Sequence, residues 1–207
     1  MPYHVYIVLS GDAKISIFDM DPDTGALAHR TDVPVPGAPA PLALHPNRRF
    51  LYVGRRDDLE VSAYAIDAAS GDLSLVGSST LESDPCYFAT DRTGRYLFSA
   101  YYFDGRVAVH RIQDDGSVAG EAVEWLDTAK GAHSIQTDAS NRFAFVPHIA
   151  GSVGPNMILQ FRFDERTGVS ARTRPAGSSP AKSWVPATSA STRASTSSTS
   201  PTSRGAA

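Results

Sequence analysis

Short stretches of alternating apolar and polar residues run along most of the chain, and turn-forming residues separate them. One example begins at residues 96–99, passes the turn at Asp104-Gly105, and continues through residues 107–112 to a second turn at residues 114–116. Period-two alternation bounded by Gly, Asp, Asn and Pro is typical of β-strands. No segment shows the apolar spacing of an amphipathic helix. The pattern therefore predicts an all-β protein.

The pattern also repeats with a period of about 46 residues. Aromatic residues recur at one position of the repeat, with spacings of 46, 46 and 47 residues: Tyr6, Tyr52, Phe98 and Phe145. Two further series run in parallel: Phe18, Tyr64, His110 and Phe161, and the turn glycines Gly25, Gly71, Gly116 and Gly168. A period of this length with about four strands is typical of the blades of a β-propeller. We predict about four blades, near residues 3–36, 37–82, 83–129 and 130–177.

The first of these blades differs from the others. Innermost strands are expected at residues 42–44, 87–90 and 134–137, which lie in the second, third and fourth repeats. The first repeat begins directly at its second strand, so we predict an incomplete first blade. The remaining segment, residues 178–207, is rich in Ser, Thr and Ala and contains almost no large apolar residue. Such a composition cannot offset the entropy of ordering, and it predicts a disordered C-terminal tail.

Composition and charge exclude several classes of protein. The chain has 207 residues, of which 42% are hydrophobic, and it contains one cysteine, Cys86, so no internal disulfide is expected. No apolar run is long enough to span a membrane and the start lacks a signal-peptide pattern, so we expect a cytoplasmic protein without a membrane partner. All 22 acidic residues lie at or before Glu165, whereas six of the 19 basic residues follow it. The net charge is therefore −9 up to Glu165 and +6 after it, which argues against a nucleic-acid partner for the body.

Several motifs, in order, resemble the seven-bladed propeller lactonases of the bacterial 6-phosphogluconolactonase type. They comprise residues 45–50 (HPNRRF), 51–56 (LYVGRR), His133-Ser134 with residues 138–142 (DASNR), and residues 154–156 (GPN). The resemblance covers about residues 3–169. It implies a seven-bladed ring that hydrolyses 6-phosphogluconolactone to 6-phosphogluconate in the pentose phosphate pathway, so a small sugar lactone is the expected partner.

The resemblance leaves alternatives open. Only about four of seven blades are accounted for, so we expect a C-terminal truncation, and we hypothesise that a frameshift produced the residues after about 177. An inactive fragment is one consequence, and self-association through exposed blade faces is another. A carboxymuconate cyclase-type lactone enzyme has the same family resemblance. A non-catalytic propeller that binds partner proteins is a third possibility.

Propeller geometry limits the candidate site to one end of the channel. Loops entering the inner strands and loops joining the second and third strands emerge there, whereas His45 belongs to a turn at the other end. His133 begins an inner strand, and its imidazole can take a proton from water. Arg56 can bind a phosphate through its guanidinium fork, and Tyr102 can donate a hydrogen bond to an oxyanion. We predict these three as the catalytic residues.

Three further residues are predicted to bind substrate: Arg55, His148 and Asn156. His148 and Asn156 flank the longest loop of the repeat, and loops of this kind often carry binding residues. The competing explanations are structural: His133 satisfied by neighbouring backbone, Tyr102 packed against a blade end, and Arg56 paired with Asp57 or Asp58. No glycine loop precedes a helix and no Cys/His cluster has metal-ligand spacing, so we expect neither a cofactor nor a metal.

Overall fold

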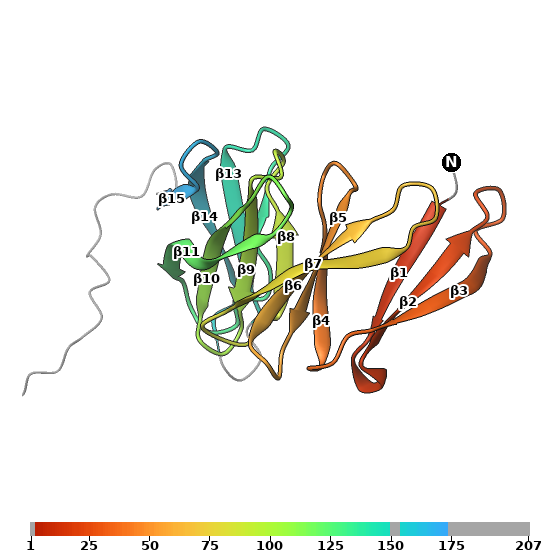
Figure 1. Ribbon diagram of the computed structural model, residues 1–207. Helices are drawn as coiled ribbons and strands as arrows, with labels where there is room; N and C mark the ends of the chain where they lie inside the picture. The colour runs from red at the N-terminus through yellow and green to blue at the C-terminus, as the bar shows by residue number, and fades with distance from the viewer. Residues whose placement is uncertain (1–2, 150–153, 174–207) are drawn as a thin grey trace, which may run out of the picture. The chain divides into compact units, whose positions relative to one another are not determined.

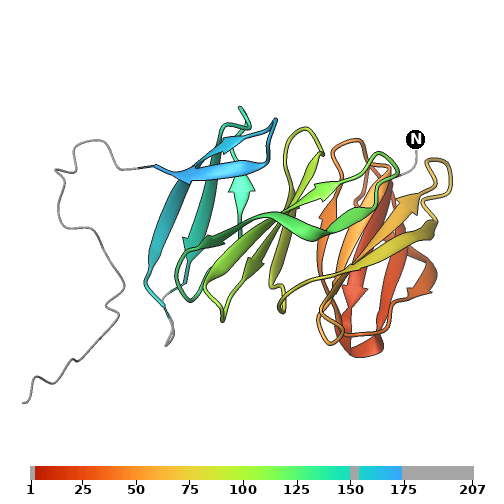
Figure 2. The same cartoon turned by 60° about the vertical axis from the view of Figure 1, so that its left-hand side comes forward.

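The computed structural model describes residues 3–149 and 154–173, which contain four β-sheets (Figures 1 and 2). The first sheet, blade 1, consists of β1 (Tyr3–Leu9), β2 (Lys14–Met20) and β3 (Leu27–Pro34), with the short 3₁₀ turn η1 (Ser10–Asp12) between its first two strands. Blade 2 consists of β4 (Pro39–Leu44), β5 (Phe50–Arg55), β6 (Glu60–Ile66) and β7 (Leu73–Thr80). Blade 3 consists of β8 (Tyr87–Thr90), β9 (Tyr96–Tyr101), β10 (Arg106–Ile112) and β11 (Val118–Asp127). Blade 4 consists of β12 (Gln136–Thr137), β13 (Phe143–His148), β14 (Met157–Asp164) and β15 (Val169–Arg172).

Each blade is an antiparallel meander whose strands are hydrogen-bonded in chain order. Blades 2, 3 and 4 have four strands, whereas blade 1 has three and lacks the innermost one. The prediction of an all-β propeller with about four blades and an incomplete first blade is therefore confirmed. The predicted tail, residues 178–207, lies outside the described residues.

The repeat places equivalent residues at equivalent points of each sheet. Tyr52 in β5 lies opposite Ala63 in β6, and Phe98 in β9 lies opposite Val109 in β10, 46 residues further on. Strands in the middle of a stack are covered on both faces, and β9 is buried along its whole length. This explains why the central strands contain continuous apolar runs rather than simple alternation.

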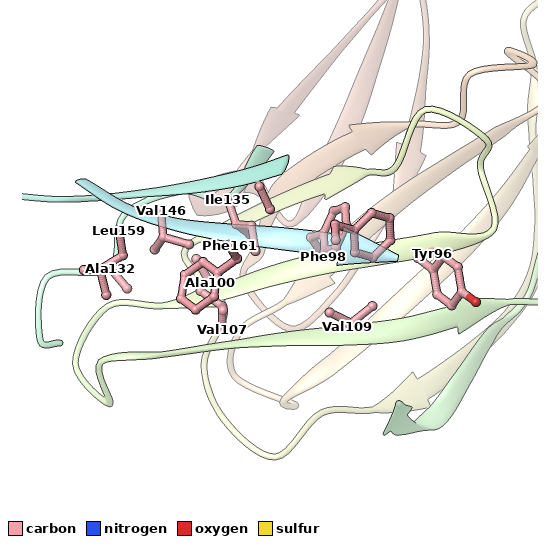
Figure 3. Packing of buried hydrophobic residues seen from close by; sticks show 12 residues of the cluster. Tyr96, Phe98, Ala100, Val107, Val109, Ala132, Ile135, Val146, Leu159 and Phe161 are labelled. Atoms are coloured by element: carbon pink, nitrogen blue, oxygen red, sulfur yellow. The ribbon is translucent and has the colours of Figure 1, made fainter. Parts of the chain in front are cut away.

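Apolar clusters fill the space between successive blades. Figure 3 shows the cluster between blades 3 and 4, to which β9, β10, β13 and β14 contribute side chains. Within it, the rings of Phe98 and Phe163 meet edge to face with centroids 5.1 Å apart. Comparable clusters join blade 1 to blade 2 around Ile15 and Val53, and blade 2 to blade 3 around Tyr52 and Leu97. Burial of these side chains against the neighbouring blade is the main stabilising contribution.

The turns after the second strand of each blade share one geometry in blades 1, 2 and 3. They span residues 10–13, 56–59 and 102–105, and their last residue has a positive φ of 51°, 53° and 68° respectively: Ala13, Leu59 and Gly105. The carbonyl of that last residue accepts a hydrogen bond from a backbone amide at or just beyond the end of the blade's outermost strand. The donors are the amides of Val35, Leu81 and Thr128, at 2.7, 2.7 and 2.8 Å respectively. Arg56 and Tyr102 therefore occupy the same position of the repeat in neighbouring blades.

The turns that follow the innermost strands lie at the opposite end and hold adjacent blades together. His45 follows β4, and its Nε2 donates to the Gly94 carbonyl at 2.9 Å, while Nδ1 accepts from the Asn47 amide at 3.1 Å. Gly94 has φ +74°, and a Cβ there would lie 2.3 Å from the His45 ring. His45 therefore has a structural role at the end away from the candidate site, as its turn position suggests.

Candidate functional site

All six candidate residues lie at one end of the blades, either in loops or at the last residue of a strand. Backbone hydrogen bonds link the segments there, among them Arg56 N to Ala38 O at 3.3 Å, Gly131 N to Tyr102 O at 2.8 Å, and His133 N to Pro147 O at 3.0 Å. We call this end the channel mouth, defined by the turns at residues 56–59 and 102–105, the loop between β13 and β14, and the segments that lead into β8 and β12.

Tyr102 and His133 come together at the mouth although they belong to different blades. Their rings meet edge to face with centroids 6.1 Å apart and an interplanar angle of 83°. Tyr102 is half-buried whereas His133 is exposed, so the imidazole is accessible to water. An exposed imidazole beside a phenolic hydroxyl can accept a proton from water while the phenol donates to a developing negative charge.

Arg56 forms a two-pronged ion pair with Asp84, a residue of the segment that leads into β8. Its Nε and Nη2 donate to the two carboxylate oxygens at 2.6 and 2.5 Å. The Asp84 carboxylate raises the pKa of Arg56 above its usual value, so the guanidinium is charged at every physiological pH. The partner differs from the expected neighbours Asp57 and Asp58. A phosphate that binds Arg56 must therefore compete with Asp84.

Cys86 lies between the Arg56–Asp84 pair and the Tyr102–His133 pair. Its Sγ is 3.4 Å from the Ala132 carbonyl and 3.7 Å from the His133 carbonyl. Burial raises the pKa of the thiol, although the charge of Arg56 acts in the opposite direction. The protonated thiol can donate to these carbonyls, so Cys86 supports the segment that positions His133.

Arg55 has several partners within its own blade and the loop before it. Its Nε donates to the Pro36 carbonyl at 2.8 Å, Nη1 donates to Glu60 at 2.7 Å, and Nη2 donates to Asp58. These bonds tie the turn at residues 56–59 to the segment that leads into β4. In this arrangement the Arg55 side chain stabilises the loop that presents Arg56.

His148 and Asn156 lie on either side of the loop between β13 and β14, of which residues 150–153 are outside the described residues. His148 is only 2% exposed, and neither ring nitrogen has a hydrogen-bond partner among the described residues. Burial lowers the pKa of His148, so its imidazole is neutral near pH 7. Asn156 is exposed directly before β14. Among the described residues, no side-chain hydrogen bond or ring contact joins His148 or Asn156 to the Tyr102–His133 pair.

Sequence analysis missed two residues of the mouth, Asp84 and Phe103. Phe103 follows Tyr102 and packs edge to face on its ring, with centroids 5.1 Å apart. The 46-residue period contained a signal for Phe103, because the equivalent residue of blade 2 is Asp57 and an aromatic residue is unusual at a turn tip. The period contained no signal for Asp84, since the Arg56–Asp84 pair joins non-equivalent positions of two blades.

The innermost strands line a separate hollow of about 310 Å³ whose lining includes Leu44, Tyr87, Thr90 and Gln136, and Gln136 donates to the Tyr87 hydroxyl. Within the described part of the chain, no three His, Cys, Asp or Glu side chains are arranged to hold a metal ion. No helix in the same residues has the length and apolar character needed to cross a membrane.

A sequence profile described as "Lactonase, 7-bladed beta-propeller" matches residues 7–182. The chain belongs to this lactonase family. The match covers most of the chain and agrees with the four sheets. The resemblance inferred from the HPNRRF, LYVGRR and DASNR motifs is therefore confirmed.

Individual members of the family show how much of the fold this chain represents. The 6-phosphogluconolactonase of Cronobacter sakazakii is 37% identical over 147 residues, which are 71% of this chain and 43% of that protein. A solved structure of a proposed 6-phosphogluconolactonase from Bacteroides uniformis superposes with a TM-score of 0.72 at 18% identity, covering 82% of this chain and 50% of the other. The periplasmic gluconolactonase of Pseudomonas aeruginosa gives a TM-score of 0.57 at 18% identity, covering 86% of this chain and 69% of the other. The chain thus spans less than half the length of the curated relative that it matches.

Proposed function

We propose that this protein hydrolyses a phosphorylated sugar lactone, 6-phosphogluconolactone, to 6-phosphogluconate. The observation that carries the proposal is the 37% identity to a 6-phosphogluconolactonase over 71% of the chain. The mouth supports it, because a guanidinium, an imidazole and a phenol from three different loops lie at the same end of the blades, and the imidazole is in ring contact with the phenol. The reaction belongs to the pentose phosphate pathway, and a phosphorylated substrate accords with a cytoplasmic location.

The chemistry assigned to the mouth needs no cofactor. His133 accepts a proton from water as the water oxygen attacks the lactone carbonyl carbon. The Tyr102 hydroxyl donates a hydrogen bond to the carbonyl oxygen, which becomes an oxyanion. The bond between the carbonyl carbon and the ring oxygen then breaks, and the ring oxygen takes the proton from the His133 imidazolium to form the open-chain hydroxyl. Arg56 binds the phosphate and the exposed Asn156 is a further substrate contact, whereas the His148 ring is buried and is not open to substrate.

The activity is tested by following acid release from 6-phosphogluconolactone and subtracting the rate without protein. A rate above the spontaneous one supports the proposal, and a purified chain that adds nothing to the spontaneous rate overturns it. Muconolactone serves as the comparison substrate, because a carboxymuconate cyclase-type enzyme would prefer it. A higher kcat/KM with muconolactone would transfer the assignment to that class of lactone enzyme.

We expect Arg56→Ala to raise the KM for 6-phosphogluconolactone about tenfold and to leave that for unphosphorylated gluconolactone unchanged. In the wild type, charge-assisted hydrogen bonds from Arg56 to the phosphate stabilise the bound substrate, and the variant loses them. Competition from Asp84 reduces the net contribution of these bonds. Asp84→Asn should have the opposite effect, since it releases the Arg56 fork for the phosphate. Arg48→Ala, in an exposed turn at the opposite end, is the control. Equal KM changes with both lactones would show that Arg56 does not recognise the phosphate.

Self-association through the outer faces of blades 1 and 4 accompanies this activity. Ile158 is 61% exposed on the side of β14 that faces away from blade 3, whereas its repeat equivalents Val61 and Val107 are buried between blades. Tyr3 and Ile7 are likewise exposed on blade 1. The outer face of blade 4 is apolar, like the faces that pack between neighbouring blades inside the protein. The outer face of blade 1 in a second copy can therefore pack against it.

We expect Ile158→Glu to raise the dissociation constant of self-association at least about tenfold, because the carboxylate would have to be desolvated in the contact. Sedimentation equilibrium over a range of protein concentrations measures this. Leu75→Glu is a matched control, since Leu75 is 60% exposed but lies on β7, the outermost strand of blade 2. A wild-type chain that stays monomeric at every concentration would contradict the proposed self-association.

A further inference from the structure

Phe103 is the most exposed large apolar side chain in the described part of the protein, with 65% of its surface accessible. It lies in the turn between β9 and β10, and it contributes to none of the clusters that join the blades. The equivalent turns of blades 1 and 2 have Gly11 and Asp57 at this position. A turn of this geometry therefore needs no aromatic residue, and the fold does not explain the ring.

The surroundings of Phe103 place it beside the predicted chemistry. Its ring meets Tyr102 edge to face at 5.1 Å, and Tyr102 in turn meets His133 at 6.1 Å. The hydrogen bond from Gly131 N to Tyr102 O fixes this turn against the segment that positions His133. Three rings thus follow one another at the mouth, and the outermost has most of its surface open to a ligand.

The face of an aromatic ring has a specific chemical preference. It is electron-rich, and it attracts the weakly positive hydrogens of C–H bonds. A six-membered sugar lactone has hydroxyl groups around its edge and C–H bonds on the faces of its ring. An exposed phenyl ring can cover one such face without competing for the hydroxyls, whereas a small aliphatic lactone has less surface to offer.

We infer that Phe103 is the stacking platform for the sugar ring, and that it selects six-membered sugar lactones over small aliphatic lactones. The inference rests on the proposed function and specifies how the same site recognises its substrate. Arg56 on the neighbouring blade binds the anionic end, Phe103 covers the ring, and His133 contacts Tyr102, the residue next to Phe103. Two anchors on different loops hold the ring while the reacting carbon is presented to water.

The test uses a ligand that cannot be hydrolysed, so that binding is measured apart from catalysis. Glucose 6-phosphate and inorganic phosphate are titrated separately into the full chain and its variants, and binding is followed in protein NMR spectra. We expect Phe103→Ala to weaken glucose 6-phosphate binding about tenfold, Phe103→Tyr to stay within about threefold of wild type, and inorganic phosphate binding to be unchanged. Phe145→Ala, which removes an exposed ring on the outer face of blade 4, should leave both affinities unchanged.

The outcomes separate this inference from the proposed function. Unchanged glucose 6-phosphate affinity in Phe103→Ala, or no binding of this sugar by the wild-type chain, overturns the platform even when lactone hydrolysis is found. A Phe103-dependent affinity in a chain that hydrolyses no lactone supports the platform and overturns the proposed reaction. Because Phe103 is exposed and outside the apolar clusters, its replacement should leave the thermal unfolding midpoint unchanged, and a lowered midpoint would indicate a structural role instead.

Discussion

Replacing Asp91 by alanine is expected to lower the free energy of unfolding by about 3 kcal/mol, because several buried donors lose their acceptor together. Asp91 follows β8 and is fully buried. One carboxylate oxygen accepts from the Tyr96 amide at 2.9 Å. The other accepts from the Thr93 amide at 3.0 Å and from Nδ2 of Asn141 at 2.9 Å. With alanine at this position, these donors would have no acceptor in a buried site that water does not readily reach.

The bond to Asn141 extends the effect beyond the Asp91 turn. Asn141 belongs to blade 4, and its Nδ2 also donates to Glu165 at 2.9 Å while its Oδ1 accepts from the Arg92 amide at 3.0 Å. One amide side chain therefore joins the inner turn of blade 3 to two turns of blade 4. Loss of Asp91 should loosen this contact between blades as well as the local turn.

Asp138 provides the matched control, because it is the blade 4 equivalent of Asp91. It accepts hydrogen bonds from Ser140 and from the amides of Arg142 and Phe143, all within its own turn. These bonds lower the pKa of Asp138 to about 2, the side-chain bond from Ser140 being the largest cause. Their contribution is present at neutral pH and would be lost only as the pH falls toward 2. Since water can replace them, Asp138→Ala should cost less than Asp91→Ala.

Urea unfolding of the two variants and the wild type, followed by tryptophan fluorescence, measures the difference. A lower midpoint for Asp91→Ala with an unchanged slope would indicate loss of stability without a change in the surface exposed on unfolding. Equal losses for Asp91→Ala and Asp138→Ala would contradict the role given to the contact between blades.

The repeat explains how much of the fold could be predicted from the sequence. A period of 46 residues assigns each turn to a blade and each strand to a place within it, so the sequence alone predicts that Arg56 and Tyr102 both lie at the mouth. The period also predicts that His45 lies at the opposite end and that blade 1 lacks its innermost strand. These are statements about equivalent positions, and a period is sufficient to make them.

Contacts between non-equivalent positions could not be predicted in this way. The competing explanation for Arg56 is a pair with Asp57 or Asp58, whereas the structure pairs it with Asp84 of the next blade. The sequence does not indicate the three acceptors that the structure places around the guanidinium of Arg55. The sequence places His148 in a loop, whereas in the structure it ends β13 and pairs with Ala132 in the segment that leads into β12. Side-chain burial and pairing depend on how blades pack, and an alternating pattern does not encode that packing.

The largest expected effect on catalysis comes from His133→Gln, which should lower kcat for 6-phosphogluconolactone by about 10²- to 10⁴-fold, the range typical of a lost general base. Glutamine keeps a polar side chain of similar length but cannot accept a proton from water at neutral pH. The His133 side chain is exposed, so the change should not alter the fold, and a circular dichroism spectrum identical to that of the wild type would establish this. KM should change little, because Arg56 and the ring contacts bind the substrate.

The control for His133→Gln is His29→Gln, which removes another exposed imidazole that is hydrogen-bonded to Asp32 in blade 1, away from the mouth. Tyr102→Phe should lower kcat by about 10²-fold if its hydroxyl donates to the oxyanion. The double variant should lose less than the product of the two single losses, since both groups act on one transition state. A wild-type kcat in His133→Gln would remove the imidazole from the mechanism and leave lactone hydrolysis to Tyr102 and the backbone of the mouth.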